Sequence, residues 1–418
     1  MLKRAQIRIV GKMSLATSIA ALTLIALPAT SQTANDGDFN NSQDQAGDVL
    51  ATQTLTVIQN DGLTKAESAA TGNDVQVGND SMDANLNSVQ TLRGSVRATA
   101  YIEGVNTGDE DLSLGTPVYA TTQAIGNYAT GVTNGAHLTA ATHQDSTAAQ
   151  VETITDVQAP NNAIYVSGEG NAVTEVNHTA YEVTNGRLDA QSWQTSATAA
   201  KANVSATVHY SPSPNAYNAS ATNNSYAAYS DDRGSQEHTV TQDQSAMTQA
   251  RAEVFAGNVW NMTATSNAVA NTVDLQNQGG SLVVDNKQTQ TGAVQSQAVV
   301  QADQYGEAYA TANGIGNQMS AGNNDKYVRI DNNQVSSGGV DVSASFDGNV
   351  GWDGYTSATA VGNQAVGYAC AECQADMAAN NTQLNNSDVT ATSNATVARG
   401  RSLVSSARAT GNSATFYV

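Results

Sequence analysis

The chain has 418 residues and a formal net charge of −20, with 37 acidic against 17 basic side chains. This balance disfavours nucleic acid and anionic membranes as partners, and it suits cations, neutral sugars or a positively charged partner. Only 5% of the residues are aromatic and 13% are charged, so the chain lacks the bulky residues of an ordinary globular core. Ala, Thr, Ser, Val, Asn, Gln and Gly fill it instead.

The N-terminal residues predict a secretory signal peptide over residues 1–31. MLKRAQIRIVGK carries four basic and no acidic residues, SLATSIAALTLIAL is a short apolar run, and Ala29-Thr30-Ser31 supplies the small residues that a signal peptidase reads. No later segment approaches the run of about 20 apolar residues that a membrane helix needs. We therefore expect an exported chain, with a polar N-terminal segment over residues 32–50 and a repetitive β-domain over residues 51–418.

Strict alternation of inward and outward side chains predicts strands along the whole β-domain. VRATAYI at residues 96–102, VDVSASF at residues 340–346 and VTATSNATV at residues 389–397 each place apolar residues, with one Ser, at every second position. Successive side chains of a strand point to opposite faces, so this pattern is typical of strands with one buried face. A disordered low-complexity chain gives no reason for it.

A short phrase recurs along the β-domain, as SATAVGN at residues 357–363 and ARATGN at residues 407–412. Aligning its variants on the last residue gives Asn73, Asn127, Asn171, Asn223, Asn267, Asn317, Asn363 and Asn412. The mean interval of about 48 residues fits a β-solenoid, or β-helix, with a small-residue core and two rungs of about 24 residues per repeat. Roughly 16 such rungs would form a rod roughly 75 Å long. An array of antiparallel β-sandwiches is the alternative fold.

The enriched order Gly-Asn predicts structural turns where the chain passes from one sheet to a facing sheet. Gly would adopt the left-handed conformation there, and Asn would stack in a ladder with Asn above and below. The predicted turn residues are Gly72, Asn73, Gly126, Asn127, Gly170, Asn171, Gly316, Asn317, Gly362, Asn363, Gly411 and Asn412. Gln-rich segments such as residues 288–304 are spaced for similar ladders, and the open ends of the stack need a cap or a docking partner.

The sequence offers little chemistry. Cys370 and Cys373 form a lone CxxC, for which a local disulfide is the leading interpretation in an exported protein, ahead of a redox or zinc site. The five histidines show no metal-ligand spacing. The Tyr-rich segment at residues 209–230 predicts an irregular insertion between rungs, with a sugar-contacting loop as the second interpretation. We predict no catalytic residues, no metal and no cofactor.

Two classes of function fit such a β-rod: a structural or adhesive surface protein, and a carbohydrate-active enzyme on a β-helix. Lyases that act on uronates usually need clustered Lys and Arg to stabilise a developing anion. The basic residues of this chain are few and dispersed, so the structural class is favoured and we predict that the protein is not an enzyme.

From MLKRAQIRIVGKMSLATSIAALTLIAL through the ATGN-like repeats to ATGNSATFYV, the chain resembles the holdfast anchor protein D family of stalked alphaproteobacteria. The resemblance implies a non-enzymatic protein at the cell surface or outer membrane of a Gram-negative bacterium, which anchors the adhesive holdfast polysaccharide to the envelope. It also implies a second, smaller anchor subunit and export through a curli-type outer-membrane pore. The alternative is a curli-like, amyloid-like adhesin that polymerises with its own copies into a fibre.

Overall fold

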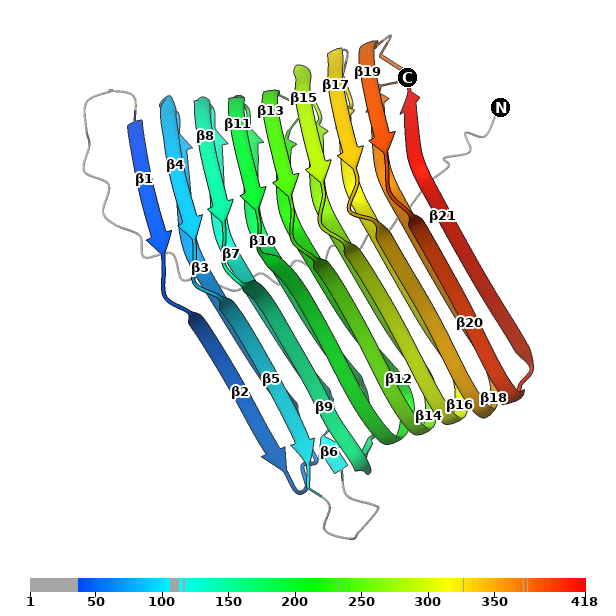
Figure 1. The fold of residues 1–418 in the computed structure, drawn as a ribbon. Helices are drawn as coiled ribbons and strands as arrows, with labels where there is room; N and C mark the ends of the chain where they lie inside the picture. The colour runs from blue at the N-terminus through cyan, green and yellow to red at the C-terminus, as the bar shows by residue number, and fades with distance from the viewer. Residues whose placement is uncertain are drawn as a thin grey trace, which may run out of the picture. The chain divides into compact units, whose positions relative to one another are not determined.

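Parallel strand pairing between successive coils builds the whole computed structural model. It describes residues 37–418, apart from residues 106–112, 116, 232, 326, 371 and 374. The predicted signal peptide lies outside the described residues. Each coil consists of a first arm, a return arm that runs back behind it, and a short arm that lies beyond the first arm on the same face (Figure 1).

The short arms form one eight-stranded sheet: β1 (Gly37–Gln45), β4 (Ala84–Leu92), β8 (His137–Ser146), β11 (Arg187–Ser196), β13 (Ser235–Gln244), β15 (Ser281–Gln290), β17 (Tyr327–Ser336) and β19 (Asp376–Asn385). The separate first arms are β2 (Val49–Val57), β5 (Val96–Gly104), β9 (Gln150–Ile164) and β20 (Val389–Arg399). The separate return arms are β3 (Thr64–Asp80), β7 (Val118–Asn134), β10 (Gly168–Thr184) and β21 (Ser402–Tyr417). Four long strands contain both arms: β12 (Ala199–Ser230), β14 (Thr248–Asn277), β16 (Val294–Asn323) and β18 (Val340–Ala369). The short strand β6 (Ser113–Gly115) pairs with β9.

The register confirms a β-solenoid and shows that one repeat makes one coil. Val294 pairs with Val340 and then with Val389, so each residue contacts its equivalent one full repeat away. The expected two rungs per repeat are wrong, because the first arm and the return arm of one coil face each other across the core instead of stacking. The eight short arms mark eight coils, and the stack is about 40 Å long instead of 75 Å. All described pairings are parallel, which excludes the antiparallel sandwich.

Two separate apolar cores fill the coils. The large core lies between the first arms and the return arms and consists mostly of Ala and Val, such as Ala298 and Val342. The small core lies between the short arms and the return arms and holds larger residues, such as Leu282 and Ile330. Along β14, Ala268 belongs to the large core and Val273 to the small core. The buried Asn271 between them marks a polar boundary.

Five of the six predicted Gly-Asn turns lie at this boundary, inside the return arm and not between two sheets, whereas Gly170-Asn171 lies near the start of β10. In β18, the inward positions are Ala358 and Ala360 before the phrase and Asn363 and Ala365 after it, so the alternation changes phase by one residue. The expected left-handed glycines are wrong here: positive φ occurs at Gly115, Gly135, Gly280 and Gly339, and at none of the six glycines of the phrase. A small residue is favoured for another reason. A Cβ atom on Gly316 would lie 2.5 Å from the carbonyl oxygen of Gly362 in the next coil.

Two further expectations about chain organisation differ from the structure. Residues 37–50 already contribute β1 and the start of β2, so the boundary expected at residue 51 falls inside the first coil. The Tyr-rich segment is no irregular insertion, because it forms the bend and the return arm of β12. Its register shifts between Ser211 and Pro214 against β14, and between Val208 and Tyr210 against β9. Tyr217 and Tyr226 are fully buried. Their rings fill space that small side chains leave in neighbouring coils, since Gly170 lies against the ring of Tyr217.

Candidate functional site

A continuous ladder of asparagine side chains runs through the boundary between the two cores. Each Nδ2 donates to the Oδ1 of the next member at 2.7–2.9 Å. Each Nδ2 also donates to a backbone carbonyl of the short arm; in Asn317, for example, this bond reaches Val335 O at 2.9 Å. The members are Asn73, Asn127, Asn177, Asn224, Asn271, Asn317, Asn363 and Asn412.

A second ladder of glutamines on the short arms runs beside it with the opposite polarity. Each Nε2 donates backwards to the Oε1 of the preceding member at 2.7–3.0 Å. It also donates to a return-arm carbonyl, as from Gln288 to Gln318 O at 2.8 Å. The members are Gln43, Gln90, Gln144, Gln194, Gln242, Gln288, Gln334 and Gln383. The two ladders therefore link the short arm and the return arm of every coil through side-chain hydrogen bonds.

Five of the asparagines assigned to turns from sequence belong to the asparagine ladder: Asn73, Asn127, Asn317, Asn363 and Asn412. Asn171 does not, because it pairs in register with Thr121 and accepts a hydrogen bond from Asn218 at 3.0 Å. The repeat alignment also missed Asn177, Asn224 and Asn271, which follow Val, Asn and Ala instead of Gly. The change of alternation phase at each of them is the signal that could have found them.

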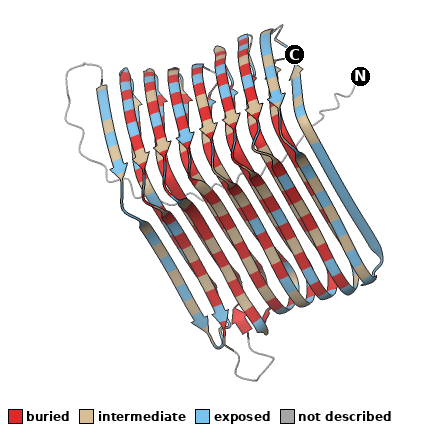
Figure 2. Ribbon diagram, in the orientation of Figure 1, coloured by how far each residue is buried: buried red, intermediate tan, exposed pale blue. Residues whose placement is uncertain are grey.

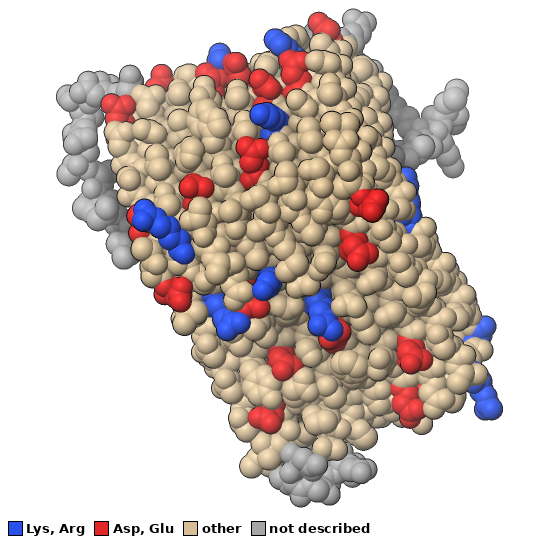
Figure 3. Space-filling model, in the orientation of Figure 1, with Lys and Arg blue, Asp and Glu red and all other residues tan. Residues whose placement is uncertain are grey.

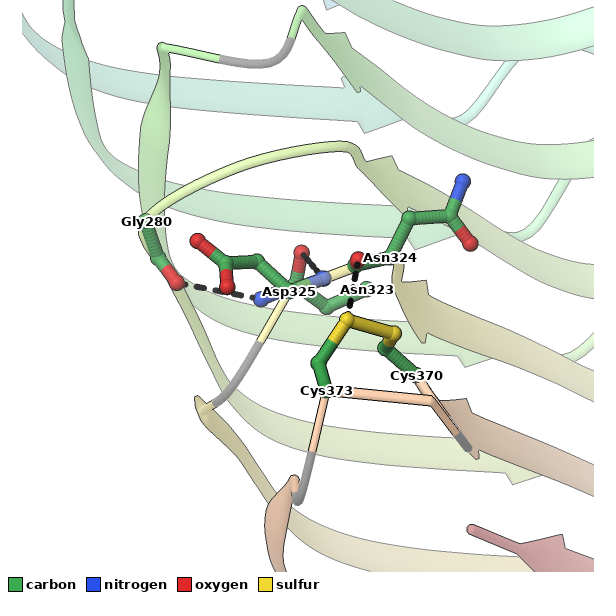
Figure 4. The surroundings of a disulfide bond; sticks show 6 residues. All are labelled: Gly280, Asn323, Asn324, Asp325, Cys370 and Cys373. Carbon is green, nitrogen blue, oxygen red and sulfur yellow. Dashed lines mark hydrogen bonds between the residues drawn. A yellow bond between two sulfur atoms is a disulfide. The ribbon is translucent and has the colours of Figure 1, made fainter.

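Cys370 and Cys373 form a disulfide in the turn between β18 and β19. Figure 4 shows the disulfide beside the equivalent turn of the preceding coil, where the Sγ atom of Cys373 lies 3.6 Å from Asn324 O. In that turn, Asn323 Nδ2 reaches Gly280 O, one coil further back, at 3.2 Å. The disulfide thus closes the turn that leads into the last short arm.

A groove of about 500 Å³ crosses the last four coils at the end of their first arms. Its floor consists of small inward residues, including Ala302 and Gly348. Exposed side chains stand along its walls: Phe255, Gln301, Asp303, Asp347, Asn349 and Thr396. Asn349 Nδ2 donates to Asp303 Oδ1 at 2.8 Å. The groove thus combines an aromatic face, carboxylates and amides, and none of the described residues that line it is Lys or Arg.

Exposed aromatic residues continue along the adjacent bend. Trp260 and Trp352 are 48% and 50% exposed, and their ring centroids lie 5.2 Å apart across the coil between them. Gly306 of that coil permits this contact, because a Cβ atom there would lie 3.0 Å from the Trp260 ring. The guanidinium of Arg401 lies 5.3 Å from the centre of the Trp352 ring. Arg401 also hydrogen-bonds Asp353 and lowers the pKa of that carboxyl group.

Two histidines have opposite environments. His238 is fully buried, with Nδ1 2.8 Å from Tyr226 Oη and Nε2 2.7 Å from Gln236 Oε1, and burial lowers its pKa to about 3. His178 is partly buried, which opposes its charge, but its Nδ1 lies 3.0 Å from Glu175 Oε2 and this ion pair raises its pKa. His238 is therefore neutral in the folded protein near pH 7, whereas the charged form of His178 is favoured.

Titratable side chains do not converge in the part of the chain that the structure describes: no group of three or more His, Cys, Asp or Glu residues could hold a metal ion. Within the same residues, no helix is long and apolar enough to cross a bilayer.

These features define a parallel β-solenoid whose two apolar cores are joined by continuous amide ladders. A family model described as holdfast attachment protein D matches residues 58–339, about two thirds of the chain. The chain belongs to this family, which confirms the resemblance seen in the sequence. The family is one of attachment proteins and not of enzymes, and membership implies a role in holdfast attachment at the cell envelope or surface. No curated protein and no solved structure matches the chain.

Proposed function

We propose that the protein is a rigid, non-enzymatic anchor that holds an adhesive polysaccharide, the holdfast, to the outer membrane or cell envelope. Membership of the holdfast attachment family carries the proposal. The solenoid supports it, because every coil is cross-linked by both ladders and a load applied at one place is shared by many hydrogen bonds. Export by a signal peptide belongs to the same proposal.

We place the polysaccharide contact in the groove at the end of the first arms. Sugar rings pack on aromatic faces, and their hydroxyl groups hydrogen-bond to carboxylates and amides, which Phe255, Asp347 and Gln301 supply in the groove. Asp303 and Asp347 would repel a uronate chain, and the lining residues that the structure describes include no Lys or Arg to offset them. The groove therefore suits a neutral or amine-bearing polysaccharide that runs along the stack axis.

Family membership also supports two partners as part of this proposal. One is a second, smaller anchor subunit, and the other is a curli-type outer-membrane pore that exports the chain. Both would be found by mild cross-linking of envelope preparations that contain the full-length protein. Recovery of the protein without either partner would remove them from the proposal and leave the polysaccharide contact unaffected.

Binding of purified holdfast polysaccharide to immobilised protein tests the groove directly. We expect Asp347→Lys to weaken binding at least about tenfold, because it places a long cationic side chain in the groove. Asp341→Lys is the matched control: Asp341 is exposed on the same first arm of β18, but six positions away and outside the groove. Equal binding by both variants would exclude the groove, and no binding by the unmodified protein would exclude the function.

A further inference from the structure

The two end coils leave unpaired sheet edges among the described residues. β1, β2 and β3 pair only with strands of the second coil, and β19, β20 and β21 pair only with strands of the seventh. Figure 2 shows β1, β2 and β21 in pale blue and tan, whereas the inner strands carry regular red bands of buried residues. Leu50 is 66% exposed in the first coil and Leu403 is 46% exposed in the last. Open parallel edges of this kind are templates for further strand pairing.

The ladders end with complementary hydrogen-bonding groups. In the last coil, Asn412 accepts from Asn363 through Oδ1, so its Nδ2 is the group available to a further coil. In the first coil, Asn73 donates to Asn127 through Nδ2, so its Oδ1 is the available acceptor. The two ends of the asparagine ladder therefore fit each other as donor and acceptor.

The glutamine ladder is complementary in the opposite sense. Gln383 donates to Gln334 through Nε2 and leaves Oε1 available in the last coil. Gln43 accepts from Gln90 through Oε1 and donates one hydrogen to Asp74 O, which leaves the second hydrogen of its Nε2 available in the first coil. A copy stacked in the same direction would continue both ladders, whereas a copy stacked in the reverse direction would bring like groups together.

The spacing of the two end coils also matches. Gln43 precedes Val49 by six residues, and Gln383 precedes Val389 by six. Strand pairing from coil to coil connects Val49 in the first coil to Val389 in the last. Val294 and Val340 lie in the same column, meaning the set of equivalent positions paired along the stack. The ladder asparagine follows Val49 by 24 residues and Val389 by 23. The arms of the two end coils are thus nearly equal in length and can pair in register.

Charge favours the same arrangement. Residues 37–80 of the first coil carry seven acidic residues and one lysine, whereas residues 376–418 of the last coil carry three arginines and two aspartates. Figure 3 shows Lys and Arg side chains along the rim at β21. Arg408 on the outer face of β21 would lie opposite Ala69 of a stacked copy. Glu67 of that copy lies two residues before Ala69 on the same face of β3 and is therefore near Arg408. One like-charge pair, Asp388 above Asp48, opposes the attraction.

We infer that the last coil of one copy pairs with the first coil of a second copy of this chain, in parallel and head to tail. This pairing extends both cores and both ladders without interruption, and each added copy lengthens the rod by about 40 Å. The inference does not rest on the proposed polysaccharide contact, because Asn412, Gln383 and Arg408, from which it is argued, do not line the groove.

Asn412→Asp is the sharpest test. The aspartate keeps an Oδ1 atom to accept from Asn363, but it removes the Nδ2 donor and brings a carboxylate against Asn73 Oδ1 of the next copy. Asn87→Asp adds the same charge on the exposed face of β4 and is the matched control. In sedimentation velocity on the chain without its predicted signal peptide, we expect rods that lengthen with concentration for the unmodified protein and the control. We expect about tenfold weaker association for Asn412→Asp.

A charge exchange separates this pairing from non-specific aggregation. Arg408→Glu and Glu67→Arg should each weaken self-association. A mixture of the two variants should associate again, because the carboxylate introduced at position 408 of one copy then meets the guanidinium introduced at position 67 of another.

Three results would overturn the inference: an unmodified protein that stays monomeric, side-by-side dimers in electron micrographs, or equal association by Asn412→Asp and its control. Polysaccharide binding per copy by Asn412→Asp should be unchanged, so the two proposals can fail separately.

Discussion

The inner coils and the end coils have nearly the same sequence pattern but very different surroundings. Asn271 in an inner coil is fully buried and donates or accepts three side-chain hydrogen bonds, whereas Asn412 in the last coil is exposed and is bonded to one other ladder member. The alternation that buries every second residue of β14 leaves every residue of the first half of β21 exposed. In a solenoid, a residue thus contributes to stability through the coils on both sides of it, and the same substitution should have different costs along the stack.

The largest difference is expected for removal of a ladder amide. Asn271→Ala leaves Thr289 O, Asn317 Oδ1 and one hydrogen of Asn224 Nδ2 buried without their partners. Each unsatisfied group costs about 1–3 kcal/mol, so we expect the free energy of unfolding to fall by about 4 kcal/mol. Asn412→Ala should cost less than about 1 kcal/mol. Chemical denaturation of both variants checks this, and equal losses would mean that the coils do not differ.

Acid should weaken the inner coils through His238. Its folded pKa of about 3 lies below the ordinary value of 6.5, so below about pH 6.5 the unfolded chain binds a proton that the folded chain excludes. Stability from this group is therefore complete above about pH 6.5 and is lost as the pH falls towards 3, by an amount on the order of 5 kcal/mol. The nearby Asp189 partly offsets the shift.

The pH dependence of unfolding should be flatter in His238→Gln than in the unmodified protein. If the variant does not fold, the NMR titration of the His238 ring in the unmodified protein gives the same information. A ring that becomes protonated near its ordinary pKa of 6.5 in the folded state would contradict the assignment.

A matched pair of glycines in one column tests the effect of the next coil on packing. A Cβ atom on Gly362 would lie 2.5 Å from Gly411 O and 2.7 Å from Asn385 Oδ1, whereas a Cβ atom on Gly411 would meet nothing closer than 3.5 Å. We expect Gly362→Val to cost about 2 kcal/mol and Gly411→Val to cost less than about 0.5 kcal/mol in thermal unfolding. Val176 occupies this column in another coil, so a similar small loss in both variants would show that the coils adjust.

The smallest effect is expected from the disulfide. It closes a loop of only a few residues in the turn before the last short arm, so replacing both Cys370 and Cys373 by Ser should lower stability by about 1 kcal/mol. Hydrogen exchange should show the loss in β19 and leave β15 unchanged. Faster exchange throughout the inner coils would contradict a local role.

Much of the fold could be predicted because its signals are local. Alternation in segments such as residues 340–346 identified strands with one buried face, and the recurring phrase identified a solenoid with a repeat of the right average length. The same phrase misled at Asn171, Asn223 and Asn267, because composition rather than structure placed an Asn near the expected position. The groove was not predicted, since its lining residues come from four different coils and share no sequence motif; they include Phe255, Gln301, Asp347 and Thr396.

The sequence by itself determined that this protein is a repetitive β-structure with one buried face to each strand, because alternation and repetition depend only on the order of residues along the chain. The tertiary structure decided that one repeat closes one coil, which asparagines form the ladder, and what the two ends offer each other. Those features depend on contacts between residues 46 to 54 positions apart. The local sequence patterns are the same whether two strands of one repeat pair side by side or face each other across a core.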